Sequence, residues 1–463
     1  MPKDREEQFE HLVAEALANN PMQDAVAKSV GQWAKQHELA REKFNDLELA
    51  RRRAGFIRWR AIESLDKYLI EFESNFQKKG GKVIWAPTAA DALKEIETIL
   101  QKHGNGKVVK SKSSACEEVG LNEFLTAKKT EVLETDLGAY IQQRRGQKPF
   151  HPVTPAMHQT REQAAAAMPA NWKLPQRAQA TEIAEAFAKN IHHEFAEAGV
   201  GITGANFLIS ETGSITLVEN EGNAALVSLL PKTLIVLAGI DKITCHLNDL
   251  DTLLPMLSAY GTGEILTAYN SILGGPAKPN QDGPNEIYVI LLDNGRSNLL
   301  ANTRHRQAAH CIRCGACHHV CPVFKQIGGH SYDSAYNGPI GQVTMPWLQG
   351  FKENKHLPYA STACGACTTA CPVKIDLHEL IVSARNEMNE AGMAGLQEKY
   401  MWGTWKKMML RRKRMNQSNA IKGFMFKTAF RKGWGQQRVF PGLAERSFNE
   451  MWKDQFGEGG EEG

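Results

Sequence analysis

Seven of the nine cysteines in this 463-residue chain lie within 61 consecutive positions, in two motifs that end alike. The first motif has the pattern Cys-x2-Cys-x2-Cys-x3-Cys-Pro, and the second has Cys-x2-Cys-x3-Cys-Pro. The first pattern is that of bacterial ferredoxins, in which three thiolates bind one four-iron cluster and the fourth binds a neighbouring cluster. The two motifs therefore predict a pair of iron–sulfur clusters that share crossed ligands.

The crossed rule assigns four cysteines to the first cluster and three to the second. The first set is Cys311, Cys314, Cys317 and Cys371, and the second set is Cys321, Cys364 and Cys367. The second set is one cysteine short, and the missing ligand would fall at Ser361. Three alternatives stay open: ligation by the serine, a 3Fe-4S cluster, or a 4Fe-4S cluster whose last iron is held by water or by another side chain near Ser361.

Zinc is the main alternative metal, because paired Cys-x2-Cys motifs also build structural zinc sites. A zinc ribbon needs neither a third cysteine at the same spacing nor the x3-Cys-Pro ending, and here that ending occurs twice. Iron is therefore favoured. His310, His318 and His319 could tune or ligate a cluster, but we expect them to be exposed histidines beside it. The isolated Cys116 and Cys245 are expected to be small buried apolar residues.

The composition indicates an ordinary multidomain protein, with 42% hydrophobic residues, 23% charged residues and a net charge of +4. These values exclude neither an enzyme nor a binding protein. The longest apolar run, 233–240, is far shorter than the roughly 20 residues of a membrane span, and the charged start lacks a signal-peptide core. Since clustered thiols are typical of metal ligands in a reducing compartment, we expect a cytoplasmic protein.

Hydrophobic periodicity divides the chain into four predicted parts. An amphipathic helical arm occupies 1–75, an α/β domain 76–300, an α-helical ferredoxin domain with two clusters 301–395, and a basic segment with an acidic, glycine-rich tail 396–463. The 42 residues between Cys321 and Cys364 exceed what a minimal ferredoxin needs, which favours the helical kind. The predicted fold is thus multidomain α/β plus α.

Strands and helices alternate in the α/β part, which is typical of a parallel sheet. The pattern predicts helices at 88–103, 113–128 and 176–197. It predicts strands at 82–86, 107–110, 131–134, 206–210, 214–218, 233–237 and 286–292, the fourth and fifth forming a hairpin.

Two groups of polar residues follow predicted strands, where ligand sites of α/β sheets gather. The group at 219–223 has the sequence Glu-Asn-Glu-Gly-Asn, which is also ordinary turn chemistry, and the turn interpretation is favoured. Lys110 with Ser111, Ser113 and Ser114 could bind a carboxylate, although a structural role is favoured here too. Arg144 and Arg145 are expected at the surface. No Gly-x-Gly-x-x-Gly motif follows a strand, so no nicotinamide or flavin is indicated, and the catalytic residues stay unknown.

The C-terminal segment contains a basic stretch from 399 to 432 that includes no acidic residue. Trp402, Trp405, Met408 and Met409 lie at helical spacing, opposite the charges. Such a helix either packs on a partner subunit, which is favoured, or rests on anionic lipid near a quinone pool or a membrane cytochrome. The basic residues are Lys399, Lys406, Lys407, Arg411, Arg412, Lys413, Arg414, Lys422, Lys427, Arg431 and Lys432.

Together these features resemble the lactate-utilisation iron-sulfur protein B family over nearly the whole chain. The stretches that carry the resemblance are 110–114, 134–138, 201–206, 211–223, 311–322 with 328–332, and 359–372. The resemblance implies a LUD-type α/β domain of the NagB/RpiA/CoA-transferase-like kind, fused to a helical ferredoxin domain. It also implies two 4Fe-4S clusters despite the short second motif, so Ser361 leaves a ligand unexplained without overturning the assignment.

As to function, the resemblance implies an electron-transfer subunit of a complex that oxidises L-lactate to pyruvate and allows growth on L-lactate. The implied partners are a cysteine-rich CCG-domain subunit and a small LUD-domain subunit, and the chain itself would chiefly carry electrons. One alternative is an iron–sulfur subunit for another 2-hydroxy acid such as glycolate. Another is a redox-sensing regulator, but no DNA-reading motif supports it, and no nucleic-acid partner is expected.

Overall fold

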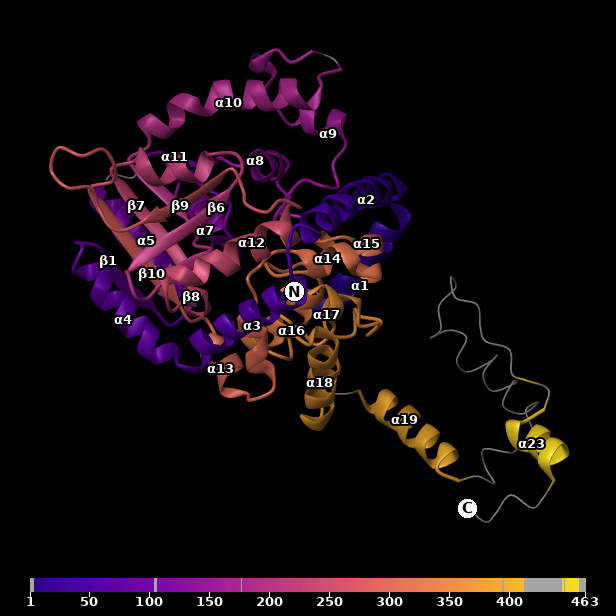
Figure 1. Cartoon of the computed structure of the whole chain (residues 1–463). Coiled ribbons are helices and arrows are strands. Elements are labelled where there is room, and N and C mark those ends of the chain that lie inside the picture. The colour runs from indigo at the N-terminus through magenta and orange to yellow at the C-terminus, as the bar shows by residue number, and fades with distance from the viewer. Residues whose placement is uncertain are drawn as a thin grey trace. The chain divides into compact units, whose positions relative to one another are not determined.

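The computed structural model describes residues 4–103, 106–175, 177–393, 395–411, 444 and 446–457 (Figure 1). The chain forms two compact units, Met1–Met388 and Asn389–Gly463. The first unit contains the predicted helical arm, the α/β part and both cysteine motifs. The predicted domain boundaries within this unit stay predictions.

The predicted helical arm is a run of four helices. They are α1 (Arg5–Ala18), α2 (Asn20–Arg41), α3 (Leu47–Glu63) and α4 (Leu65–Gln77). The side chains of Asp4, Asn19 and Asp46 cap the first three helices by accepting backbone N–H groups of the first turn. Figure 1 shows that α3 and α4 run along one side of the sheet, where α4 packs on the first strand.

The main sheet has six parallel strands in the order β1-β10-β7-β4-β2-β3. Their bounds are β1 (Lys82–Ala86), β2 (Val108–Lys110), β3 (Val132–Glu134), β4 (Val200–Thr203), β7 (Thr233–Gly239) and β10 (Glu286–Leu292). Alternate residues of β7 enter opposite cores: Ile235 and Leu237 face one, while Leu234 and Val236 face the other. A strand buried on both faces needs the continuous apolar sequence seen here.

The predicted hairpin is present in a second sheet, with strand order β8-β5-β6-β9. Its strands are β5 (Phe207–Ile209), β6 (Ser214–Glu219), β8 (Ile243–Thr244) and β9 (Tyr269–Leu273). Strands β5 and β6 pair in antiparallel register. The sequence pattern did not predict β4, β8 or β9. These strands are short, and their pairing with neighbouring strands identifies them.

Helices cover both faces of the main sheet and connect its strands. They are α5 (Ala89–His103), α6 (Ser114–Glu118), α7 (Leu121–Ala127), α8 (Leu137–Arg144), α9 (Arg161–Ala166), α10 (Ala180–Glu197), α11 (Asn223–Leu229), α12 (Leu250–Gly261) and α13 (Arg296–Ala301), with the short 3-10 helices η1 (Ala170–Trp172), η2 (Ile240–Lys242) and η3 (Leu247–Asp249). The single helix predicted at 113–128 is wrong, because Gly120 adopts a left-handed conformation with φ of 68° and separates α6 from α7.

The cysteine-rich part of the first unit is helical, as predicted. Its elements are η4 (His305–His310), α14 (Ala316–Val320), α15 (Pro322–Ile327), η5 (His330–Tyr332), α16 (Gly338–Gln349), α17 (Ala366–Ala370) and α18 (Leu377–Glu390). One apolar core joins this part to the helical arm and to α12, with Ile57, Leu253, Val343 and Ile381 all buried in it. The two parts of the first unit are therefore packed together.

The second unit contains α19 (Leu396–Met409) and α23 (Phe448–Phe456). Trp402 and Trp405 on α19 are half exposed, at 53% and 50%. Seven of the predicted basic residues and the acidic glycine tail, 458–463, lie outside the described residues; the seven are Arg412, Lys413, Arg414, Lys422, Lys427, Arg431 and Lys432. Within the described ranges, no helix combines the length and apolarity that crossing a bilayer would take.

Candidate metal centre

Four cysteines from the two motifs line one pocket: Cys311, Cys314, Cys317 and Cys371. Burial and then the neighbouring thiolates raise the pKa of Cys317, because like charges in one site oppose ionisation. Burial likewise raises the pKa of Cys371 to about 12, with Cys311 adding to the effect. All four are free thiols. An all-sulfur donor set of this kind fits an iron–sulfur cluster. The net positive charge of the cluster core would stabilise thiolates that are buried away from water.

The other three motif cysteines form a second group. Burial raises the pKa of Cys321, and the charge of Cys364 adds to it. Burial and then Cys321 raise the pKa of Cys367 to about 11. Cys364 is exposed, and the backbone N–H of Ala366 lowers its pKa. Cys321, at the end of the first motif, thus lies against the start of the second motif. In the same way Cys371, at the end of the second motif, lies against the first three cysteines of the first motif.

The two motifs share one backbone geometry. Gly315 and Gly365 both adopt φ of 81°, and each precedes a helix of five residues, α14 or α17. The cysteine after each helix is extended, with φ and ψ of −74° and 117° at Cys321 and of −69° and 119° at Cys371. The left-handed conformation at these positions favours glycine. The structure therefore contains two copies of the same ligand loop.

This equivalence extends to the position where the second motif lacks a cysteine. In the first loop, the N–H of Arg313 donates to the sulfur of Cys311 at 3.4 Å; in the second, the N–H of Ala363 donates to Oγ of Ser361 at 3.1 Å. Arg313 and Ala363 both adopt positive φ, 62° and 52°. The Ser361 oxygen thus occupies the local position that the Cys311 sulfur has in the first loop.

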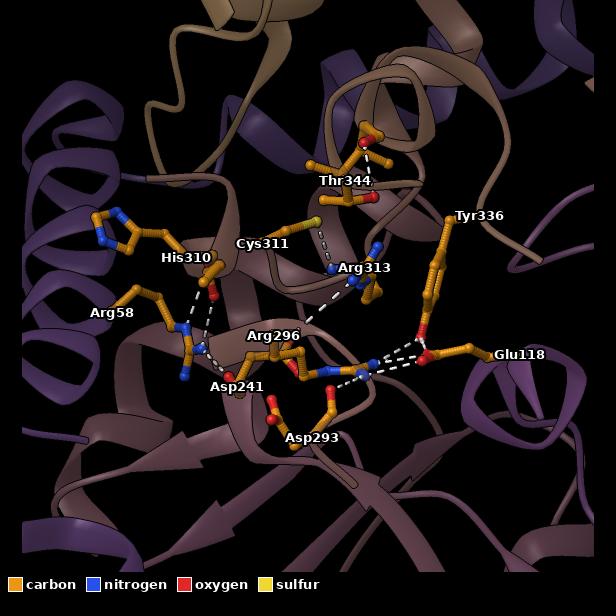
Figure 2. Close-up of polar contacts among 12 residues, drawn as sticks. Arg58, Glu118, Asp241, Asp293, Arg296, His310, Cys311, Arg313, Tyr336 and Thr344 are labelled. Atoms are coloured by element: carbon orange, nitrogen blue, oxygen red, sulfur yellow. Dashed lines mark hydrogen bonds and ion pairs between the residues drawn. The ribbon is translucent and has the colours of Figure 1, made fainter. Parts of the chain in front are cut away.

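Arg58 of α3 holds the start of the first loop against the α/β part. Its buried guanidinium donates to the carbonyl oxygens of His310 at 3.3 Å, Ala309 at 3.2 Å and Ile243 at 2.5 Å, and to that of Asp241. Figure 2 shows Arg58 between His310 and Asp241. One side chain thereby satisfies carbonyl groups from two separate parts of the chain, which fixes the approach to Cys311.

A buried ionic network lies beside the same loop (Figure 2). Arg296 of α13 donates to Glu118 of α6 at 2.7 Å and to Asp241, just after β7, at 2.7 Å. The hydroxyl of Tyr336 donates to Glu118 at 2.6 Å. Burial alone would raise the pKa of Glu118, but Arg296 outweighs it and the pKa is lowered. No local sequence pattern indicates this network, because its members are far apart along the chain.

Arg313 brings a positive charge directly to the first group of thiols. Its guanidinium lies on the ring of Tyr336, 3.9 Å from the centroid, and its Nη2 is 3.9 Å from Oδ2 of Asp241. Its Nη1 atom is buried and has no hydrogen-bond partner among the described residues. Figure 2 places Arg313 between Cys311 and Tyr336. Burial alone would lower the pKa of Arg313, but Cys311, Tyr336 and Asp241 outweigh it and the pKa is raised, so the guanidinium stays charged beside these thiols.

The expectation that His310, His318 and His319 are exposed is wrong. Their exposed fractions are 7%, 2% and 5%. Nε2 of His318 lies 2.9 Å from both oxygens of Asn337, and His319 packs edge-on against Trp33. Burial lowers the pKa of His318 to about 4 and that of His319 to about 3, so both rings are neutral at neutral pH. By contrast, Cys116 and Cys245 are buried, as predicted, and Arg144 and Arg145 are exposed.

A cavity of about 330 Å³ adjoins the first loop, at the carboxyl ends of β2, β4 and β7. Its lining includes both predicted polar groups, the turn at 219–223 and the serines Ser111, Ser113 and Ser114, together with Lys242, Arg313 and Cys314. The turn interpretation holds as well, because Glu219 accepts the N–H groups of Ala224 and Ala225 and so caps α11.

Lys110 is not available to a ligand. Its side chain is fully buried, and its ammonium pairs with Glu134 at 2.6 Å and with Glu117 at 3.2 Å. The alternative in which Lys110 binds a substrate carboxylate is therefore wrong, since internal carboxylates occupy its charge. The cation on this side of the cavity is Lys112, paired with Asp136 at 2.8 Å.

Two family models match the chain. The LUD domain matches residues 69–292, and the 4Fe-4S dicluster domain matches residues 307–375. The second match covers all seven motif cysteines. The first covers the strands of both sheets and ends at the last residue of β10.

Curated relatives match over most of the chain. "Lactate utilization protein B" of Geobacillus sp. (strain WCH70) is 42% identical over 84% of this chain and 83% of the relative. The protein of the same name from Bacillus licheniformis is 38% identical over 98% of each chain. That of Bacillus subtilis (strain 168) is 41% identical over 84% of this chain and 82% of the relative.

Proposed function

The chain belongs to the lactate utilization protein B family, and from this premise we propose that it is the iron–sulfur electron-transfer subunit of a system that oxidises L-lactate to pyruvate. The observation that carries the proposal is the gathering of seven free thiols into two adjoining groups beside a polar cavity. Iron–sulfur clusters bound by such groups pass single electrons. The α/β domain, which we assign to the NagB/RpiA/CoA-transferase-like kind, would supply the cavity.

We assign two 4Fe-4S clusters to these thiols. The first would be held by Cys311, Cys314, Cys317 and Cys371, and the second by Cys321, Cys364 and Cys367. The crossed arrangement is supported because Cys371 shares a pocket with the first three cysteines, while Cys321 interacts with Cys364 and Cys367. Cys317 and Cys321 lie four residues apart, at the two ends of α14, so the two clusters would be neighbours suited to electron relay.

For the second cluster we propose Oγ of Ser361 as the fourth ligand, rather than a 3Fe-4S cluster or an iron held by water. The equivalence of the two loops supports this, since Ser361 accepts the same backbone hydrogen bond as Cys311. Arg385 holds the serine in place by donating to the carbonyl oxygens of Ser361 at 2.7 Å and Pro358 at 2.9 Å.

Anaerobic EPR and Mössbauer spectroscopy of the reconstituted chain test this ligand. Ser361→Ala should convert one cluster to a 3Fe-4S form on mild oxidation, whereas Ser361→Cys should retain eight irons and shift the spectrum of one cluster only. Thr369→Ala removes an exposed hydroxyl from the same motif and is the matched control. If Ser361→Ala gives the wild-type spectra and iron content, serine ligation is wrong.

The role in lactate oxidation is tested by deleting the gene in a strain without another lactate oxidase. Growth on L-lactate as sole carbon source should stop and should return with the wild-type gene. A gene in which Cys314 is replaced by serine should fail to restore it. Normal growth of the deletion strain would overturn the proposal, and a defect on glycolate alone would assign a different 2-hydroxy acid.

We further propose that the chain acts in the cytoplasm with a CCG-domain cysteine-rich subunit and a small LUD-domain subunit. The exposed Trp402 and Trp405 on α19 support a packing surface for a partner, and Lys399, Lys406 and Lys407 on the same helix would also suit anionic lipid. Co-purification of the three tagged subunits tests the assembly. Sedimentation with anionic liposomes at low and high salt tests the lipid contact, which should be lost in salt.

A further inference from the structure

We propose that the cavity at the carboxyl ends of β2, β4 and β7 binds a small 2-hydroxycarboxylate, with Lys242 and Arg313 holding its carboxylate and Glu221 accepting its hydroxyl hydrogen bond. This inference rests on the proposed function and deepens it. It would place the substrate of the system on this chain, next to Cys314 and the first cluster. Only binding is proposed, and the acceptor of the electron pair is left to the assembled complex.

Lys242 is the first observation. It ends η2, immediately after β7, and it lines the cavity. Within the described part of the chain, its ammonium has neither an ion-pair partner within 4.0 Å nor a hydrogen bond. The adjacent carboxylate of Asp241 is already bound by Arg296. Lys242 is only partly exposed, so holding its charge there without an acceptor is costly, and an anionic ligand would remove that cost.

Arg313 is the second observation, and it comes from the cysteine loop rather than from the sheet. Its Nη1 is buried and has no partner in the described structure, while its other contacts, with Tyr336 and Asp241, leave that donor free. Guanidinium groups bind carboxylates through two parallel hydrogen bonds, so an Arg with a free, fixed donor suits such a ligand. A carboxylate on Arg313 would lie beside the first cluster.

The acidic lining defines the class of ligand more narrowly. Glu219, Glu221 and Asp136 also line the cavity, so a dianion such as phosphate would be repelled. Glu221 is an exposed residue of the cavity lining, where desolvation and then Asp136 raise its pKa to about 7; this makes it a better acceptor of a hydroxyl hydrogen bond than a carboxylate with the usual pKa. A small monoanion with a hydroxyl group satisfies both kinds of lining residue. The cavity volume, about 330 Å³, lies at the small end of ordinary ligand sites.

Equilibrium dialysis of labelled L-lactate against the anaerobic, cluster-loaded full chain tests the site. Lys242→Gln should weaken binding by about tenfold or more, because a charged hydrogen bond is lost. Lys232→Gln is the matched control: Lys232 is exposed and lies directly before β7, at the opposite end of the strand from Lys242. Lys242→Arg should retain most of the affinity. Cluster absorbance and thermal unfolding of each variant show that it has folded.

The possible results distinguish a wrong binding site from a wrong proposed function. If wild-type chain with intact clusters binds no lactate, or if Lys242→Gln and Lys232→Gln bind it equally, the site is wrong, yet the electron-transfer role stands. If inorganic phosphate competes as well as glycolate does, the ligand class is wrong. Normal growth on L-lactate after gene deletion would overturn the proposed function even if the cavity binds the ligand.

Discussion

Arg296 compensates two carboxylates that burial would otherwise make very unfavourable. Glu118 and Asp241 are both buried and both lie 2.7 Å from its guanidinium. Arg296→Leu would leave both acids without this cation, and removing one partner of a buried ion pair typically costs about 3–5 kcal/mol. We expect a loss of that size in the free energy of unfolding, measured by denaturant titration of the loaded chain.

The control for this variant is Arg161→Leu. Arg161 pairs with Glu162 at the surface, where an ion pair contributes only about 0–1 kcal/mol. If the two substitutions cost the same, the network around Arg296 does not stabilise the contact between the sheet and the cysteine loop.

His158 should make stability depend on pH. Its ring stacks on Phe150 with centroids 4.1 Å apart, and burial, followed by His330 and Arg145, lowers the pKa of His158 to about 3. The unfolded chain binds this proton at about pH 6.5, whereas the folded chain does not. The stability from the neutral ring is therefore complete above about pH 6.5 and is lost as the pH falls from there toward about 3.

His158→Phe retains the stacking and removes the titration. Between pH 7 and pH 4.5 the variant should lose about 2 kcal/mol less unfolding free energy than wild type. His192 is exposed, and His192→Phe is the control for replacing a histidine by phenylalanine outside this stack. If the unfolding free energy changes with pH equally in wild type and His158→Phe, His158 titrates normally in the folded chain.

At the residue scale, a feature could be predicted when its signal lies within one short stretch of sequence. Spacing alone predicted that the seven cysteines form two groups, with Ser361 where an eighth cysteine would fall, and the structure gathers the thiols into those two groups. Their binding to clusters stays a prediction. Burial of His318 could not be predicted, since it requires Asn337 and the close approach of Gly338 from another segment. The same holds for Lys242 and Arg313, whose shared cavity forms only when the cysteine loop meets the end of β7.

At the scale of elements, β4 depends on a glycine that sequence patterns count against a strand. A Cβ on Gly201 would lie 2.1 Å from the carbonyl oxygen of Val227, so only glycine lets α11 pack this closely on β4. The sequence therefore predicted the long apolar strands β7 and β10 but missed β4. The predicted helix at 113–128 was broken for a related reason, the left-handed Gly120.

Gly201→Ala should destabilise the chain by about 1–3 kcal/mol through overpacking. Its control is Gly31→Ala in α2, where a Cβ meets no atom within 4 Å and a helical alanine should stabilise by up to about 1 kcal/mol. Thermal unfolding of the two variants should thus shift in opposite directions. A Gly201→Ala variant as stable as wild type would mean that α11 moves away from β4 at no cost.

The proposed crossed ligation would connect elements that are otherwise separate along the sequence. Cys371 closes the pocket formed by the first motif, although 42 residues separate the two motifs. Cys371→Ser should therefore alter the cluster held with Cys311, whereas Cys364→Ser should alter the other one. EPR potentiometry of the two variants would resolve this, and the reverse pattern would indicate that each motif binds its own cluster.

At the scale of the whole molecule, the clusters should hold the cysteine-rich part together without being needed by the sheet. The main sheet has an apolar core on each face, one formed with α5, α6 and α7 and the other with α3, α4 and the second sheet. The core shared by α12, α16 and α18 instead includes Cys314, Cys367 and Cys371, whose burial as free thiols contributes little specific structure. Removing iron should therefore loosen the cysteine-rich part before the main sheet.

Hydrogen–deuterium exchange of loaded and iron-depleted chain measures this difference. Exchange should rise in α14, α16 and α17 on iron removal and should change little in β7 and β10, because only the former carry or contact the ligand loops. Cys245→Ala is the control for the loss of a buried thiol outside the motifs, and it should leave iron content unchanged. The ionic network of Arg296 joins the two regions, so exchange in α13 reports whether loosening spreads. Equal exchange increases in β7 and α14 would instead make the clusters part of one cooperative fold.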